Sequence, residues 1–131
     1  MKIWLDDIRP MPFPERIAEG KFGYPFDPEA PYDIWCKTAK EAIKLIEGGA
    51  VKFISFDHDL GDMEGEDGLW YTKYEHAPTG YDVAKKIEEW AWHGQLGPIR
   101  WKVHSANPVG SENIRKAMLS AERAWKERYN V

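Results

Sequence analysis

Four short runs of apolar, β-branched and aromatic residues stand out along the chain, and each of them predicts a strand. They cover residues 2–5, 32–36, 51–56 and 99–103. Runs of this kind, each followed by a helical pattern, are typical of βα units built around a parallel sheet. The hydrophobic pattern therefore predicts an α/β fold.

Three other segments carry the apolar spacing of amphipathic helices. Thr38 and Glu41 fit a capping box at the start of the first helix, because the hydroxyl and the carboxylate can each satisfy a backbone N–H. The three predicted helices run from Thr38 to Gly48, from Thr79 to Gly94, and from residues 107–111 almost to the C-terminus.

Two connections are too long to be simple turns. Residues 10–31 are rich in proline and aromatic residues, and we expect them to be irregular but packed, with one short helix around residues 15–19. Residues 60–78 are first acidic and then aromatic, with Trp70, Tyr71 and Tyr74 in their second half. Long connections in compact domains are usually functional lids or disordered. In the first hypothesis below, residues 60–78 would close over a substrate, with Trp70, Tyr71 or Tyr74 stacking on a base.

Polar residues directly follow three of the predicted strands. They are Asp6 and Asp7 after the first strand, Asp57, His58 and Asp59 after the third, and His104, Ser105 and Asn107 after the fourth. In an open parallel sheet, ligands bind beyond the carboxyl ends of the strands, where the strand order reverses. With strand order 2-1-3-4, all three groups meet at one edge of the sheet.

The carboxylates of this edge predict a cation site formed by Asp6, Asp7, Asp57 and Asp59. Two carboxylates about 6 Å apart repel by about 3 kcal/mol at an effective dielectric constant of about 20. Protons or a cation must therefore neutralise the cluster, and oxygen ligands favour Mg²⁺ or Mn²⁺, with a shift toward Mn²⁺ or Zn²⁺ if a histidine takes part. The alternative is that these aspartates cap helices and carry solvated loop charges.

Four further side chains have both a chemical and a structural interpretation. His104 titrates near neutrality and is a candidate acid or base, or a structural histidine. Ser105 is interpreted as a phosphate-binding hydroxyl or a cap, and Arg9 as a phosphate clamp or a partner of the neighbouring aspartates. Thr79 opens a helix whose N–H groups can receive an anion, although capping alone explains it.

Composition limits the class of protein. The chain has 131 residues, a net charge of −4 and one cysteine, Cys36. This is the length of a single domain over residues 1–131, the charge argues against general DNA binding, and a lone cysteine forms neither an internal disulfide nor a cysteine zinc site. The acidic start of the chain and the lack of a long apolar run predict a cytoplasmic protein without a membrane partner. The sequence contains neither an EF-hand loop nor a nucleotide-binding P-loop.

The order of these motifs resembles the receiver domain of bacterial response regulators. Asp6-Asp7, Asp57 and Ser105-Ala106 match the acidic pair, the phosphate acceptor and the hydroxyl residue of that family. The resemblance implies a flavodoxin-like or receiver-like three-layer sandwich. This chain has no clear fifth strand and lacks the lysine found there, which argues against an ordinary phosphorylated receiver.

A fuller set of motifs is similar to a divergent family, the cyclic-phosphate-processing receiver-like domains of bacteria and their phages, which are associated with RNA-repair enzymes. The motifs are Leu5-Asp6-Asp7-x-Arg9-Pro10, Phe56-Asp57-His58-Asp59-Leu60-Gly61, Thr79-Gly80-x-Asp82 and His104-Ser105-Ala106-Asn107. The resemblance implies a nucleotide or an RNA end carrying a cyclic phosphate as the partner.

These observations lead to two functional hypotheses. In the first, the domain is a metal-dependent phosphoesterase for a cyclic phosphate or a related phosphodiester, with Asp57, His58 and His104 as catalytic residues. Arg9, Ser105, Asn107 and Thr79 would then bind the substrate, and a covalent phosphate on Asp57 is a variant of this mechanism. In the second, the domain is a non-catalytic pseudo-receiver that sequesters a nucleotide or docks on a partner protein.

Overall fold

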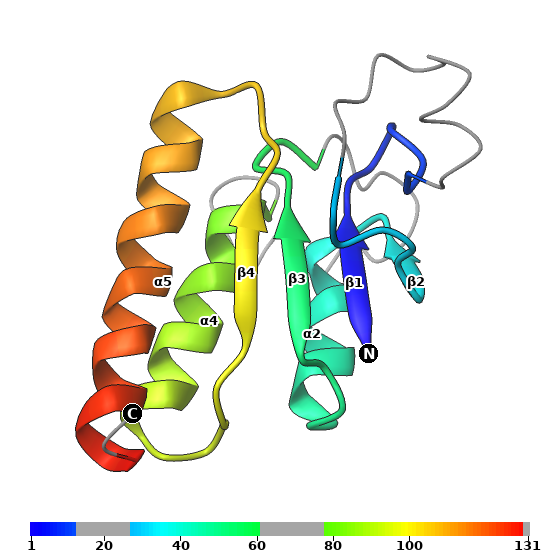
Figure 1. Cartoon of the computed structure of the whole chain (residues 1–131). Coiled ribbons are helices and arrows are strands. Elements are labelled where there is room, and N and C mark those ends of the chain that lie inside the picture. The colour runs from blue at the N-terminus through cyan, green and yellow to red at the C-terminus, as the bar shows by residue number, and fades with distance from the viewer. Residues whose placement is uncertain (13–26, 61–77, 130–131) are drawn as a thin grey trace.

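The computed structural model of the chain describes residues 1–12, 27–60 and 78–129. Within them, four strands and three helices follow one another in the order β1 (Lys2–Leu5), β2 (Ile34–Cys36), α2 (Ala39–Glu47), β3 (Phe53–Phe56), α4 (Gly80–Trp92), β4 (Arg100–Val103) and α5 (Pro108–Tyr129). The strands form one parallel sheet in the order β2-β1-β3-β4 (Figure 1). The predicted strand order and the receiver-like or flavodoxin-like α/β class are therefore confirmed.

The alternation of side chains along the strands gives the sheet two different faces. Ile3 and Leu5 of β1 are in register with Ile54 and Phe56 of β3, and all four side chains are buried. They belong to one apolar cluster that also contains the buried residues of α2, α4 and α5. The three described helices thus share this face, and α4 and α5 lie side by side (Figure 1).

The opposite face carries a smaller aromatic cluster and several polar side chains. Trp4, Tyr32 and Phe53 pack together there, and Ser55 and Lys102 occupy the same face by the strand register. Among the described residues, this face is covered by the segment 27–32 rather than by a helix. The predicted helix at residues 15–19 and nearly all of the predicted lid at residues 60–78 lie outside the described residues.

Local sequence signals explain where the helices begin and end. The backbone N–H of Glu41 donates to the hydroxyl of Thr38 at 3.1 Å, which is the cap predicted for α2. After α2, Gly49 takes a φ of +83°, a conformation that glycine adopts without a Cβ clash. The carboxamide oxygen of Asn107 accepts from the N–H of Gly110 at 2.8 Å, so Asn107 caps α5 and α5 begins with Pro108.

Three strands are shorter than their apolar runs. The run at residues 32–36 forms a strand only from Ile34, the run at residues 51–56 only from Phe53, and the run at residues 99–103 only from Arg100. Tyr32 and Val51 lie outside the strands, but their side chains are buried in the core. The hydrophobic pattern therefore predicted which segments are buried more accurately than it predicted where each strand begins.

Candidate functional site

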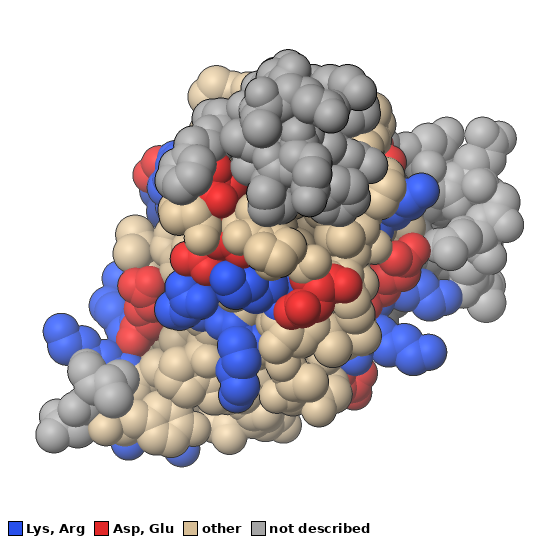
Figure 2. Space-filling view, turned by 45° about the vertical axis from the view of Figure 1, so that its right-hand side comes forward, with Lys and Arg blue, Asp and Glu red and all other residues tan. Residues whose placement is uncertain are grey.

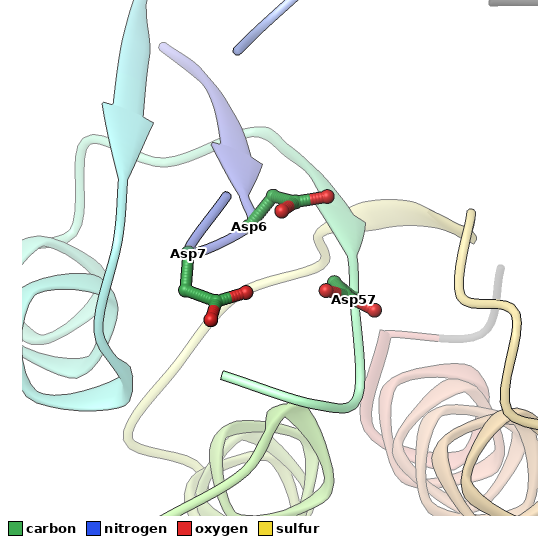
Figure 3. A group of neighbouring side chains, drawn as sticks. All are labelled: Asp6, Asp7 and Asp57. Carbon is green, nitrogen blue, oxygen red and sulfur yellow. The ribbon is translucent and has the colours of Figure 1, made fainter. Parts of the chain in front are cut away.

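Three carboxylates meet where β1 and β3 end at the same edge of the sheet. Asp6 and Asp7 follow β1, Asp57 follows β3, and one oxygen of each lies within 4.8 Å of the others (Figure 3). The N–H of Asp57 donates to the carbonyl of Leu5 at 2.9 Å, which continues the parallel pairing beyond the strands and fixes this juxtaposition. The polar groups that follow the first and the third predicted strands therefore meet in the structure, as the strand order predicts.

Asp6 is the most tightly held of the three carboxylates, and its side chain is 5% exposed. Its Oδ1 accepts from the backbone N–H groups of Ile8 and Arg9 at 2.9 and 2.8 Å, and its Oδ2 lies 3.1 Å from Nε2 of His104. Burial raises the pKa of Asp6, but the hydrogen bonds from His104 and the two backbone groups outweigh it and leave the pKa below its ordinary value. Asp6 is therefore ionised and fixed in orientation.

The carboxyl groups of Asp57 and Asp7 both resist ionisation. Burial, together with the neighbouring charges of Asp6 and Asp7, raises the pKa of Asp57 to about 6, although a hydrogen bond from Ser105 opposes the change. Burial and the charges of Asp6 and Asp59 also raise the pKa of Asp7. Three close oxygens that resist joint ionisation form a donor set that fits a hard divalent cation such as Mg²⁺ or Mn²⁺.

His104 lies beneath the acidic cluster. Its side chain is 10% exposed, its Nδ1 is 2.7 Å from the hydroxyl of Ser55, and its ring is stacked on Trp4. Burial lowers the pKa of His104 despite the proximity of Asp6. A neutral ring that faces a carboxylate carries its hydrogen on Nε2, so Nε2 donates to Asp6 and Nδ1 accepts from Ser55.

His58 and Asp59 form a second polar group with Asn107. Nδ1 of His58 is 2.9 Å from Oδ1 of Asp59, and Nδ2 of Asn107 lies 3.3 Å from the same oxygen. The hydrogen bond from His58 lowers the pKa of Asp59. The Asp59 side chain is 66% exposed and stands outside the group of three close carboxylates, although it lines the same hollow.

A hollow of about 350 Å³ opens over the acidic cluster and is large enough for a phosphate group. Its lining includes Arg9 and Ala106 in addition to the aspartates. Ser105 lies next to Ala106 and hydrogen-bonds Asp57, while its hydroxyl accepts from the N–H of Asn107 at 3.1 Å. The structure thus brings the predicted Arg9 and Ser105 to the edge of the same hollow.

Thr79 serves the start of α4. Its N–H and its hydroxyl donate to Oδ2 of Asp82 at 2.7 and 3.2 Å, so the capping interpretation describes its contacts. Gly80, the next residue, lies so close to the chain after β3 that a Cβ would overlap the carbonyl of Asp57. The start of α4 is therefore packed directly under the backbone of the site.

Three side chains that support the site had not been singled out from the sequence. Ser55 contacts His104, the indole of Trp4 stacks on the same ring, and the indole N–H of Trp35 donates to the carbonyl of Asp6 at 2.6 Å. Ser55 carried a signal, because it is a hydroxyl residue inside the most apolar strand. The two tryptophans carried none, since an aromatic residue in a strand is usually part of the core.

Surface charges are intermixed in the view of Figure 2. Lys and Arg side chains alternate there with Asp and Glu, and neither sign forms a continuous patch. On the sheet face opposite the helices, Lys2 and Arg100 pair with Glu29 at 3.1 and 3.0 Å, and Lys102 pairs with Asp27 at 2.7 Å. None of the helices in the described ranges is both long and apolar enough to cross a bilayer.

Comparison with known proteins gives one match. The model of the cyclic-phosphate processing receiver domain family matches residues 1–120, which is most of the chain. No curated protein and no solved structure matches the chain. The match spans the four strands, the acidic cluster and the greater part of α5, and it agrees with the family to which the motifs pointed. The chain therefore belongs to the cyclic-phosphate processing receiver domains.

Proposed function

We propose that this domain is a metal-dependent phosphoesterase that opens a cyclic phosphate, or a related phosphodiester, on a nucleotide or an RNA end. Membership of the family supplies the link to cyclic phosphates. The observation that carries the proposal is the meeting of Asp6, Asp7 and Asp57 within 4.8 Å, at a solvent-accessible hollow. Three close carboxylates repel one another when ionised without a cation. A bound divalent cation would relieve this repulsion and could assist a reaction at phosphate.

The three carboxylates would hold the cation in two different ways. Asp6 is fixed by its hydrogen bonds and remains ionised, so it offers a ready ligand. Asp57 and Asp7, whose pKa values are raised, are stabilised in the ionised form once a positive charge is present. A bound Mg²⁺ or Mn²⁺ would supply electrostatic stabilisation of the phosphoryl group and lower the pKa of a water molecule.

Arg9 and Ser105 are the proposed phosphate-binding residues. Arg9 lines the hollow and offers a planar guanidinium, which suits the bidentate recognition of phosphate. Ser105 hydrogen-bonds Asp57, so its hydroxyl stands beside the acidic cluster. Together they would hold the two non-bridging oxygens of a cyclic phosphodiester.

His58 is the more suitable of the two histidines for moving a proton to or from the reacting group. Its ring is held by Asp59 at one nitrogen, with Asn107 close by, and its side chain is 18% exposed. His104 has contacts at both ring nitrogens and lies beneath Asp6. The proposal therefore assigns the proton transfer to His58, in the manner of a carboxylate-oriented acid–base histidine.

A second function, a pseudo-receiver that sequesters a nucleotide without turnover, is favoured by a different observation. The imidazole nitrogens of His104, together with Nδ1 of His58, are engaged within the protein. Because His104 is held at both ring nitrogens, fewer groups at the site can move a proton, which favours binding without turnover. This hypothesis predicts saturable binding and no product.

The two functions are separated by incubating the purified chain with a panel of phosphodiesters. The panel contains 2′,3′-cyclic nucleotides, RNA with a cyclic-phosphate end, 3′,5′-cyclic nucleotides and cyclic oligonucleotides, each with Mg²⁺, with Mn²⁺ and with EDTA. Products are resolved by chromatography. Asp57→Asn tests the acidic cluster, and Glu47→Gln, an exposed carboxylate at the far end of α2, is the matched control.

The phosphoesterase is supported if ring opening requires a metal, disappears in Asp57→Asn and persists in Glu47→Gln. Loss of turnover in His58→Gln with retained Mn²⁺ binding would support the assigned proton transfer. If no member of the panel is turned over with either metal, the phosphoesterase is wrong. Calorimetric binding of a panel member would then establish the sequestering module.

A further inference from the structure

Ser55 is an unusual residue for its position. It is completely buried in the middle of β3, between Ile54 and Phe56, in the most apolar strand of the sheet. A buried hydroxyl without a partner costs about 1–3 kcal/mol by protein mutational data. Its hydrogen bonds must therefore account for its presence, and they lie on the sheet face opposite the helices.

The hydroxyl of Ser55 connects to the acidic cluster through one intervening side chain. It lies 2.7 Å from Nδ1 of His104, and Nε2 of the same ring lies 3.1 Å from Oδ2 of Asp6. The imidazole is thus held at both nitrogens, with the Trp4 ring against its face. A ring held in three directions has one orientation, which aims its Nε2–H at Asp6.

A second group of polar side chains lies on the same sheet face as Ser55. The Tyr32 hydroxyl donates to Oδ2 of Asp27 at 2.8 Å, and the same carboxylate oxygen lies 2.7 Å from the ammonium group of Lys102. Tyr32 and Asp27 are 4% and 6% exposed, so these two side chains are shielded from water. Ser55 therefore lies between the packed Tyr32–Asp27 pair and the proposed cation site.

We propose that Ser55 is a positioning residue, which fixes the orientation of the His104 ring and through it the carboxylate of Asp6. The inference rests on the proposed function, because Asp6 is there a cation ligand. The carboxylate only accepts hydrogen bonds, so Asp6 itself selects the Nε2–H tautomer, and Ser55 holds the ring from Nδ1. Without Ser55, Nδ1 loses its partner and the ring can turn, so that Nε2–H is no longer held on Asp6 and the carboxylate loses its fixed orientation.

The expected effect follows from how metal sites depend on their outer hydrogen bonds. Groups that orient a metal-binding side chain typically change metal affinity about 10–100-fold when they are removed. Ser55 is separated from the cluster by one residue, so we expect Ser55→Ala to weaken Mn²⁺ binding about 10-fold, near the low end of that range. The substitution adds no volume and keeps the strand intact.

Two measurements test the proposal on the whole chain. The first is the ¹H–¹⁵N spectrum of the imidazole of His104 without metal, in which the Nε2–H signal reports the hydrogen bond to Asp6. The second is the dissociation constant for Mn²⁺ itself, from titration calorimetry. Ser120→Ala is the matched control, because Ser120 is another buried serine with a hydrogen-bond partner, the indole N–H of Trp92. Ser55→Thr restores the hydroxyl and serves as the rescue variant.

The proposal expects a hydrogen-bonded Nε2–H signal of His104 in the wild type, a signal shifted toward that of a free imidazole N–H in Ser55→Ala, and a return toward the wild type in Ser55→Thr. It also expects the Mn²⁺ affinity to fall in Ser55→Ala alone. An unchanged His104 spectrum in a folded Ser55→Ala protein would overturn the positioning role, as would an equal loss of affinity in Ser120→Ala. Failure of the wild type to bind Mn²⁺ would overturn the proposed function, while the spectra would still decide whether Ser55 holds His104.

Discussion

The imidazole of His104 lies flat on the indole of Trp4, with ring centroids 3.8 Å apart and planes 5° from parallel. Trp4 belongs to β1 and precedes Asp6 by two residues, so both side chains are on the same face of the sheet. His104 follows β4 and crosses above β3 to reach them, with its N–H bonded to the carbonyl of Phe56 at 2.8 Å. The stack therefore ties the ends of three strands together under the site.

Trp4→Phe is expected to destabilise the protein. The substitution removes the hydrogen bond from the indole to the carbonyl of Arg9 and part of the surface that supports His104, at a site that is 2% exposed. A loss of about 1–3 kcal/mol in the free energy of unfolding is expected from the hydrogen bond and the cavity together. Urea denaturation measures it.

Trp92→Phe is the control for this prediction, because Trp92 also donates an indole hydrogen bond but is 42% exposed. Its loss is expected to be about 1 kcal/mol or less. If both variants lose the same stability, the packing under the site is not the reason for the effect at Trp4.

A divalent cation is expected to stabilise the folded chain against heat. At a concentration about 100 times its dissociation constant, Mn²⁺ would add about 2.7 kcal/mol to the free energy of unfolding. Asp7→Asn removes one of the three close carboxylates and should abolish the shift, while Glu47→Gln should retain it. Thermal denaturation with Mn²⁺ and with EDTA measures the effect, and equal shifts in the two variants would contradict the assigned site.

The raised pKa of Asp57 makes apo stability depend on pH. The pKa is about 6 in the folded chain and near its ordinary value of 3.8 when unfolded, so ionisation of Asp57 opposes folding. The cost is absent below pH 4, grows as the pH rises and is complete above the folded-state pKa. Asp57→Asn should therefore be more stable than the wild type by about 1–3 kcal/mol at pH 7.5 without metal.

Near pH 4 the stability advantage of Asp57→Asn should vanish. Denaturant titrations at several pH values in EDTA test this, and an advantage that is independent of pH would show that the charge of Asp57 is not its cause. The same ionisation predicts that the apparent affinity for Mn²⁺ falls as the pH is lowered through 6, because protons and the cation compete for Asp57.

Gly80→Ala is expected to disturb both stability and the site. The added Cβ would overlap the backbone carbonyl of Asp57, which cannot turn aside as a flexible side chain can. Overpacking of this kind costs about 1–3 kcal/mol, and here it also displaces one of the three close carboxylates. Gly97→Ala is the control, because its Cβ would meet nothing within 4 Å. Unfolding titrations and Mn²⁺ calorimetry measure the two effects, and equal results for the two variants would refute the close packing at Gly80.

The strand order and the acidic cluster could be predicted because both follow from periodic rules. Apolar runs mark buried strands, the βα alternation makes them parallel, and parallel strands bring their carboxyl ends to one edge. Asp6, Asp7 and Asp57 come together for this reason alone. The rules say less about Asp59, since alternation beyond the end of a strand no longer holds once the chain turns.

The environment of each side chain could not be predicted in the same way. Nothing local in the sequence indicates that His104 reaches across β3 to Asp6, or that Ser55 is its partner from 49 residues away. These contacts depend on register and rotamer, which three-dimensional packing decides. The sequence therefore predicted which side chains meet at this edge of the sheet better than it predicted their individual contacts.

The separation of the two sheet faces has a consequence for engineering the domain. The apolar cluster that holds the helices uses Ile3, Leu5, Ile54 and Phe56, whereas the opposite face leads from Trp4 and Ser55 to the carboxylates. Because neighbouring residues of one strand serve different faces, the hydrophobic anchoring of the helices and the chemistry of the edge can be varied by alternate positions. A designer could repack the helix-facing positions of β1 and β3 while leaving the side chains that lead to the carboxylates unchanged, so that the stability of the domain varies and the polar edge stays constant.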